Sequence, residues 1–411
     1  MNMRPRNAIG LALVVSALLG VTPRAQAQAV SEVEQLRAQL RTLEERLRQL
    51  EARQLQAPPA AAAAAPAEQA APRSVEPGTE RVNLALSGQV NRGVLYADDG
   101  TASEVFHVDN DNSSTRIRLD GDATLSEDVS VGAVIEVQFE SNSSSAVSLQ
   151  QDSPVGPNNF TERKLEVFAD SKRLGRLWLG QGDTASNGSA EIDLSGTSVV
   201  AYSSISDMAG GIEFRTAAGA FGPSIGAVFT NFDGLSRDDR IRYDTPKFGG
   251  VQASFSHVDG GSWDAALRYT GKFDEIAVAA AIAYADAASR QGYSQLSGSA
   301  SVKLPIGVSV TGAMGGRDDV AGRDPFFYYG KLAYTMAPLP WGETSVGVDY
   351  TMAEDVAAAG DEFTSYAVFL VQSVDQVATD LFVAARNHQL DRPGTSFDDV
   401  FAALGGARVK F

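Results

Sequence analysis

The stretch SFDDVFAALGGARVKF, residues 396–411, decides the fold. Its residues alternate between an apolar parity and a parity that carries charges. Successive side chains of a strand point to opposite faces, so this alternation predicts a β-strand with one apolar face. A strand whose apolar face meets lipid needs a closed barrel, because unpaired backbone groups are not left in hydrocarbon. The apolar parity holds Phe397, Phe401, Ala403, Ala407, Val409 and Phe411, and the other parity holds Asp398, Arg408 and Lys410.

The same alternation recurs from residue 83 onward, for example in residues 84–96, 129–139, 263–269 and 346–352. It predicts an all-β fold, a transmembrane antiparallel β-barrel over residues 83–411. A soluble β-rich surface adhesin with sandwich domains also alternates, but its strand ends need no aromatic residues. Here the outward parity repeatedly ends on rings, as expected of the interfacial girdles of a membrane barrel. These rings are Tyr96, Phe139, Tyr243, Tyr269, Tyr350 and Phe411.

The joints between the strands fall into two classes, which is barrel topology. Short joints lie at residues 271–274, 304–307 and 373–376, and longer polar joints at 98–113, 141–160 and 317–324. Counting candidate strands gives about eighteen, and sequence boundaries err by two to four residues, so sixteen and eighteen both stay open. Either number leaves a water-filled lumen. One long interruption, at residues 183–208, follows the fifth strand.

Composition excludes several classes of protein. The charged fraction is 21% and the mean hydropathy is −0.12, so no bundle of transmembrane helices is hidden in the 411 residues. The chain has no cysteine, which excludes disulfide frameworks, thiolate metal sites and cysteine nucleophiles. The formal net charge is −17, and removal of the leader arginines at 4, 6 and 24 gives −17 − 3 = −20. Such an acidic chain is not expected to bind nucleic acid.

Residues 1–29 have the pattern of a secretory signal peptide. Arg4 and Arg6 form a basic start, residues 9–21 an apolar middle, and residues 25–27 or 27–29 a small-x-small cleavage site. The alternative is a membrane anchor, but about 13 apolar residues are too few to span a bilayer.

Residues 30–56 are expected to form a short periplasmic coiled coil. Ser31 and Glu34 make a capping box, and the flanking pairs Glu32 with Arg37 and Arg46 with Glu51 favour parallel self-association. The alternative is a single amphipathic helix packed on its own chain. Residues 57–82 follow as an Ala/Pro-rich linker. The core positions of the coil are Val33, Leu36, Leu40, Leu43, Leu47 and Leu50.

Four segments in this order resemble the Gram-negative general porins. They are STRIRL at 114–119, GRLWLGQ at 175–181, YDTPKFGG at 243–250 and the terminal Phe411. The resemblance covers residues 83–411 and implies a homotrimer of barrels, usually sixteen-stranded, in the outer-membrane lipid, each with a third loop folded into the pore. It also implies that Phe411, with Val409, is read by the barrel-assembly machinery. Some substrate-selective relatives, including phosphate-type porins, carry a leading coil, which here could reach the peptidoglycan.

The interruption occupies the position of the inward loop, so residues 183–207 are the expected constriction. The acids of its first part, residues 183–196, are Asp183, Glu191 and Asp193, and the polar parity of nearby strands carries Arg116, Arg118 and Arg176. Acids on a loop that face bases on a wall create a field across a narrow pore. The alternative is ordinary solvation of a polar lumen. Further basic candidates are Lys164, Arg240 and Arg242.

The sequence predicts no cofactor, no metal site and no catalytic site. Residues 109–113 hint at a calcium loop, but Ser114 stands where glycine is needed and Asp120 where glutamate is needed. His107, His257 and His388 are far apart in sequence, and no nucleophile with an oriented base is evident. The expected function is a passive channel for ions and small hydrophilic solutes across the outer membrane. The alternatives are a porin selective for phosphate, another small anion or a sugar and, with less support, an outer-membrane barrel enzyme or the adhesin.

Overall fold

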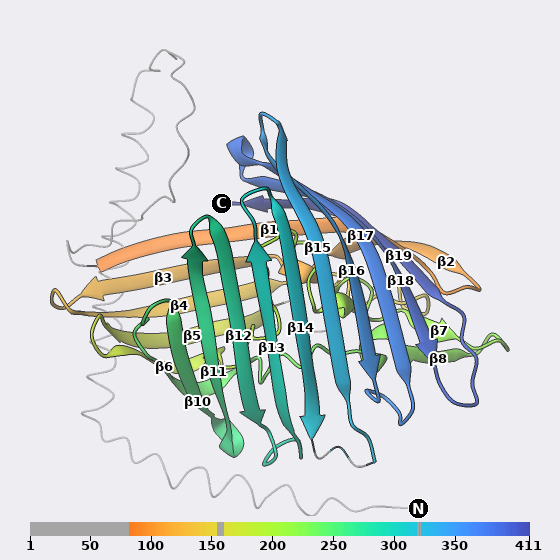
Figure 1. Ribbon diagram of the computed structural model, residues 1–411, viewed down its shortest axis with the longest axis horizontal. Helices are drawn as coiled ribbons and strands as arrows, with labels where there is room; N and C mark the ends of the chain where they lie inside the picture. The colour runs from red at the N-terminus through yellow and green to blue at the C-terminus, as the bar shows by residue number, and fades with distance from the viewer. Residues whose placement is uncertain (1–81, 154–159, 319, 321) are drawn as a thin grey trace, which may run out of the picture. The chain divides into compact units, whose positions relative to one another are not determined.

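The computed structural model describes residues 82–153, 160–318, 320 and 322–411 (Figure 1). The signal peptide, the coil and the linker up to residue 81 lie outside the described residues. The wall strands are β1 (Val82–Asp98), β2 (Ser103–Asp109), β3 (Arg116–Thr124), β4 (Val129–Phe139), β5 (Phe160–Ser171), β6 (Gly175–Asp183), β9 (Arg237–Asp244), β10 (Val251–Val258), β11 (Ser262–Phe273), β12 (Ile276–Asp286), β13 (Ser294–Lys303), β14 (Val308–Asp318), β15 (Phe326–Leu339), β16 (Gly342–Glu354), β17 (Glu362–Val374), β18 (Thr379–Asp391) and β19 (Val400–Lys410).

The sheet closes on itself. From β3 onward each wall strand pairs antiparallel with the next wall strand along the chain, and β19 returns to pair with β1. Figure 1 shows β10 to β19 side by side in this order. The backbone of Phe411 completes the seam, since its N–H donates to Gly88 O at 3.0 Å and its carbonyl accepts from Gly88 N at 2.8 Å. No edge of the sheet is left open, as a membrane-spanning sheet requires.

The barrel has sixteen strands, so the count of about eighteen is wrong and the lower number is confirmed. The sheet contains 17 strands, but β2 and β3 pair with the two halves of β1 and form one interrupted strand. The polar joint expected at 98–113 therefore contains strand β2. Two further strands, β7 (Glu213–Arg215) and β8 (Phe221–Ser224), pair only with each other. Local alternation cannot tell such an internal hairpin from a wall strand.

Large apolar side chains cover the outside of the wall. Val90 and Val409 are register partners across the β1–β19 seam, and both are exposed. The same parity carries exposed apolar residues on the other strands, among them Leu165, Leu179, Leu267, Ile282, Val310, Leu332, Val348, Val368 and Val383. The inner parity is polar or small on many strands, but on β15–β19 it also carries buried rings such as Phe327, Phe363 and Phe369. This confirms the outward apolar face expected from the sequence.

The segment between β6 and β9, residues 184–236, packs inside the barrel rather than ending near 208. It contains η2 (Ile205–Asp207), the β7–β8 hairpin and α2 (Ile225–Val228). Phe229 lies 6.1 Å from Phe327 and 5.6 Å from Phe363 between ring centroids, and all three rings are buried. Burying each such side chain contributes about 1.5–3 kcal/mol. One half of the lumen is thus filled by an apolar core between this inner loop and β15–β19.

The remaining short helices lie in joints: η1 (Asp111–Ser113), η3 (Asp259–Gly261) and η4 (Asp375–Val377). Among the described residues, no helix is both long and apolar enough to cross a membrane. Phe397, expected on the outward parity of the last strand, precedes β19 and packs on Phe214 of the inner loop at 6.2 Å. Its joint, residues 392–399, follows no strand periodicity, which explains the error.

Candidate pore constriction

Strand β11 of the wall fixes the beginning of the inner loop. Arg268 on β11 donates to Ala185 O and to Asn187 O, each at 2.7 Å. Asp264, also on β11 and fully buried, accepts from Ala185 N at 3.1 Å and from Ser186 N at 2.9 Å. The loop backbone here has no strand partner, so these side chains supply its hydrogen bonds. The loop therefore enters the lumen in a defined direction.

A buried lysine fixes the middle of the inner loop. Lys331 on β15 donates through Nζ to Asp193 Oδ2 at 2.6 Å, to Thr197 Oγ1 at 2.9 Å and to Ala201 O at 2.9 Å. All three donors of the ammonium group are used, and its side chain is only 1% exposed. Asp193, predicted as a constriction acid, thus holds the loop to the wall and does not line the open lumen.

On the opposite side, the inner loop and the wall enclose a polar cavity of about 570 Å³. Four arginines line it from the wall side or the end of the loop, and four acids line it from the loop side or from η1. The arginines are Arg116, Arg163, Arg237 and Arg317, and the acids are Asp111, Glu191, Asp207 and Asp233. The cavity thus holds both signs of charge in a narrow space.

The three acids of the inner loop that line this cavity, Glu191, Asp207 and Asp233, have no basic hydrogen-bond partner among the described residues. Asp233 accepts from the backbone N–H of Ala190 at 2.7 Å and from that of Gly188, while Glu191 accepts from Asn231 at 3.0 Å. Burial and the neighbouring Asp233 raise the pKa of Glu191 well above its usual range. Burial and the charge of Asp111 raise the pKa of Asp207 to about 7. Asp207 therefore binds a proton near neutral pH, and Glu191 holds a proton more strongly than an exposed carboxyl group does.

The arginines of the wall are only partly neutralised. Arg163 pairs with Glu136 at 2.6 Å, and Arg116 reaches the same carboxylate only at 4.0 Å. Arg317 has no ion pair among the described residues, and its guanidinium lies over the ring of Tyr293 at 4.1 Å. Because guanidinium groups keep their charge at any pH a protein meets, this side of the cavity stays positive.

The structure brings together some of the predicted constriction residues and separates others. Arg116 and Glu191 line the same cavity, and Asp183 pairs beside it with Arg237 at 2.9 Å. Arg118 is held by Asp120 at 2.7 Å and does not line the cavity. Arg176 is also away from the cavity: it pairs with Asp170 at 3.0 Å and lies over the rings of Phe168 and Trp178.

Sequence reasoning missed six charged lining residues: Asp111, Arg163, Asp207, Asp233, Arg237 and Arg317. Arg163 follows an irregularity in the β4–β5 pairing, where Glu136 pairs with Lys164 but Val137 pairs with Glu162. Such a bulge breaks the two-residue parity that sorts inward from outward positions. Asp233 lies beyond the expected end of the loop. A search for charged residues up to β9 could have found it.

The other polar candidates from the sequence lie apart from the cavity or pair with other side chains. Asp109, at the start of the supposed calcium loop, pairs with Arg92 at 2.6 Å. His107 and His257 are exposed, whereas His388 is buried against Phe363 at 5.8 Å. Within the described part of the chain, no group of three or more His, Cys, Asp and Glu residues is placed to hold a metal ion.

A closed wall with an apolar exterior and a charged lumen narrowed by an internal loop defines a transmembrane β-barrel channel. The sequence matches the family model described as Gram-negative porin over residues 57–392. The chain therefore belongs to the Gram-negative porin family. It is a passive diffusion channel of the outer membrane, and its family and fold are those of a channel rather than an enzyme. No curated protein matches the sequence.

Solved porin structures share the fold at low sequence identity. The anion-selective porin from Comamonas acidovorans has a TM-score of 0.56 and 16% identity, covering 80% of this chain and 100% of that one. Outer-membrane expressed OmpT of Vibrio cholerae has a TM-score of 0.54 and 11% identity, covering 82% and 100%. The outer membrane channel DcaP of Acinetobacter baumannii has a TM-score of 0.50 and 12% identity, covering 80% and 98%. At such identities the similarity confirms the fold alone.

Proposed function

We propose that the 570 Å³ cavity is the constriction of the channel and that it favours small anions. The observation that carries this proposal is the unequal strength of its two charged sides. The arginine side keeps its charge, whereas burial and mutual repulsion raise the pKa of Glu191 and Asp207 on the loop side. The net charge of the side chains that line the cavity is therefore positive at and below neutral pH. A positive constriction raises the local concentration of anions and lowers that of cations.

The separation of the two signs adds a second effect. Acids on the loop and bases on the wall create a field across the permeation path, which orients polar solutes and disfavours apolar ones. A channel of this kind passes small salts with current proportional to voltage. The fold is similar to that of an anion-selective porin. This similarity supports a preference for anions here, although anion selectivity itself is a property of that other protein.

The test is the reversal potential of the purified channel in a planar bilayer under a potassium chloride gradient. A reversal potential shifted toward the equilibrium potential of chloride supports the proposal, and one shifted toward that of potassium refutes it. Titration with phosphate or with a sugar then separates the two kinds of porin. Block at low solute concentration would identify a substrate-selective channel, whereas unchanged current identifies general diffusion.

We further propose that the protein assembles as a homotrimer whose contact face includes β1 and β2. Arg92 has the outward parity of Val90 and Val94, is 44% exposed, and pairs with Asp109 at 2.6 Å. Charge on the lipid side of a barrel wall costs about 2–4 kcal/mol at the bilayer midplane. A neighbouring subunit over this pair removes that contact with lipid. Loss of the oligomer in an Arg92→Glu variant, but not in Arg92→Leu, tests this face.

The coil of residues 30–56 is proposed to join the three N-termini in the periplasm and to approach the peptidoglycan. Its heptads and its attractive flanking charge pairs favour parallel association. Deletion of residues 30–56 tests both roles: trimer melting temperature and co-sedimentation with cell wall should both fall. If neither changes, the coil has neither role. Recognition of Phe411 by the assembly machinery is a separate proposal, tested below.

A further inference from the structure

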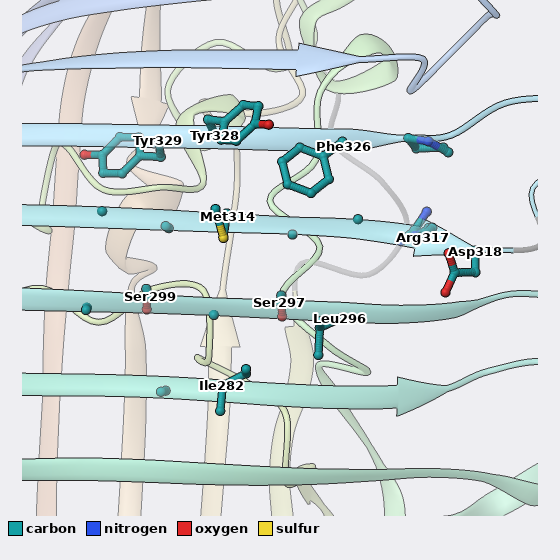
Figure 2. Close-up of a pocket in the computed structure, with 18 of the residues that line it drawn as sticks. Ile282, Leu296, Ser297, Ser299, Met314, Arg317, Asp318, Phe326, Tyr328 and Tyr329 are labelled. Atoms are coloured by element: carbon teal, nitrogen blue, oxygen red, sulfur yellow. The ribbon is translucent and has the colours of Figure 1, made fainter.

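A second cavity lies on the outside of the barrel, away from the constriction. It is a groove of about 700 Å³ across β12 to β15 (Figure 2). Leu296, Met314 and Tyr328 line it and are about half exposed, on the apolar outward parity of the wall. In contrast, Ser297 and Ser299, which alternate with Leu296, bond to Ser189 of the inner loop and so face the lumen. The groove therefore opens toward the membrane.

Gly312 lines the floor of this β12–β15 groove, and Gly330 lies beside it on β15. Gly312 and Gly330 are register partners, and neither has a positive φ. A Cβ atom at Gly312 would meet nothing closer than Tyr329 O at 3.8 Å, and one at Gly330 would meet nothing within 4 Å. Neither backbone conformation nor packing requires glycine at these positions. Glycine weakens a strand interior, and it marks places where another molecule approaches the backbone closely.

The sides of the groove are apolar, and one of its ends carries two aspartates. Arg317 also lines this end, with its guanidinium over the rings of Phe232 and Tyr293. Ile282 and Leu296 form one side, and the rings of Phe326 and Tyr328, 4.6 Å apart between centroids, form the other. Asp318 and Asp324 stand at the end near the joint between β14 and β15. This joint belongs to the rim of longer loops, because the chain ends at the opposite rim, where Lys410 N donates to Ala378 O at 3.0 Å in the β17–β18 turn. Longer loops of such barrels are extracellular.

We propose that the β12–β15 groove binds one acyl chain of lipopolysaccharide, the lipid of the outer leaflet. The exterior of the wall faces hydrocarbon, and the groove lies in its extracellular half, so outer-leaflet chains are what it meets. An acyl chain is narrow and flexible enough to follow a floor of glycines between bulky sides. The two aspartates have the same charge as lipid phosphates, so the phosphorylated head stays outside the groove. The inference does not depend on the constriction.

The experiment counts the lipids that remain on the intact protein. Native mass spectrometry of the full chain, extracted from outer membranes and washed in mild detergent, should show lipopolysaccharide retained on the wild type. Gly312→Leu with Gly330→Leu fills the groove and should abolish this retention. Gly405→Leu is the matched control, since it is also an outward glycine with its nearest neighbour at 3.7 Å but lies on β19, outside the groove. It should retain the lipid.

Equal retention in the groove-filled variant and in the wild type would overturn the proposal. Retention of phospholipid in place of lipopolysaccharide would overturn the assignment of the occupant. If the double variant does not insert, Met314→Cys provides a second measurement, because the chain has no other cysteine. A fluorophore on this cysteine should be quenched by lipopolysaccharide with brominated chains at least twice as strongly as one on Tyr366→Cys, an exposed outward position of β17 that lies in the same half of the wall but outside the groove. Equal quenching at the two positions would refute the proposal.

Discussion

Replacing Lys331 by methionine should release the middle of the inner loop from the barrel wall. The change removes three hydrogen bonds to the loop and leaves the carboxylate of Asp193, which is 5% exposed, without its cation. Breaking one side of a buried ion pair costs about 3–5 kcal/mol. Since about 1.4 kcal/mol is a factor of ten, the undocked state of residues 193–201 should become roughly a hundredfold to a few thousandfold more populated. The strands themselves keep their backbone pairing.

Single-channel recording is the assay, because movement of the loop changes the width of the pore. The Lys331→Met channel should switch between conductance levels much more often than the wild type. Adding Asp193→Asn removes the unpaired carboxylate and should lower the switching frequency most of the way back to that of the wild type. Lys272→Met, at an exposed position on β11, is the control and should behave as wild type. If Lys331→Met shows wild-type current noise, the lysine does not hold the loop and the reasoning fails.

Three further outcomes are expected. Arg116→Ala should shift the reversal potential toward cations, whereas Arg118→Ala, whose guanidinium is held by a carboxylate outside the cavity, should shift it less; equal shifts would contradict the geometry. Because the pKa values of Glu191 and Asp207 are raised, these groups take up protons as the pH falls from 8 to 5. The anion preference and the stability of the loop should therefore both rise over this range. The double variant Glu191→Gln with Asp207→Asn should flatten this pH dependence. Phe411→Ala should lower the amount of inserted barrel in membrane fractions but leave single-channel conductance unchanged, because the ring is exposed outside the lumen.

The sequence predicted the wall well because the wall follows a local rule. Val409, Phe401 and the other outward residues of the last strand are exposed as the two-residue alternation requires. The position of the long interruption after the fifth strand was also correct. Local alternation does not show where a segment packs, so the strand count was too high and Phe397 was assigned to the outward face.

The constriction was predicted only in part because it depends on contacts between distant residues. Arg116 and Glu191 were found from charge and parity, and both line the cavity. Asp193 has the same chemical character as Glu191, but it meets Lys331 on β15, 138 positions later, which no local pattern reveals. Which acids of the inner loop face the water-filled cavity depends on how the apolar core packs the loop against the wall.

The central claim is that permeating ions pass between the inner loop and the arginine wall. Ser198 is an exposed residue of the loop and lines this cavity. Since the chain has no cysteine, a thiol reagent that carries a quaternary ammonium group leaves the wild type unmodified and reacts only with a Ser198→Cys channel. During bilayer recording, the reagent should lower the single-channel current of Ser198→Cys, because it narrows the path there, and should strengthen its anion preference, because it adds a permanent positive charge. A fully labelled Ser198→Cys channel with unchanged current would contradict the account.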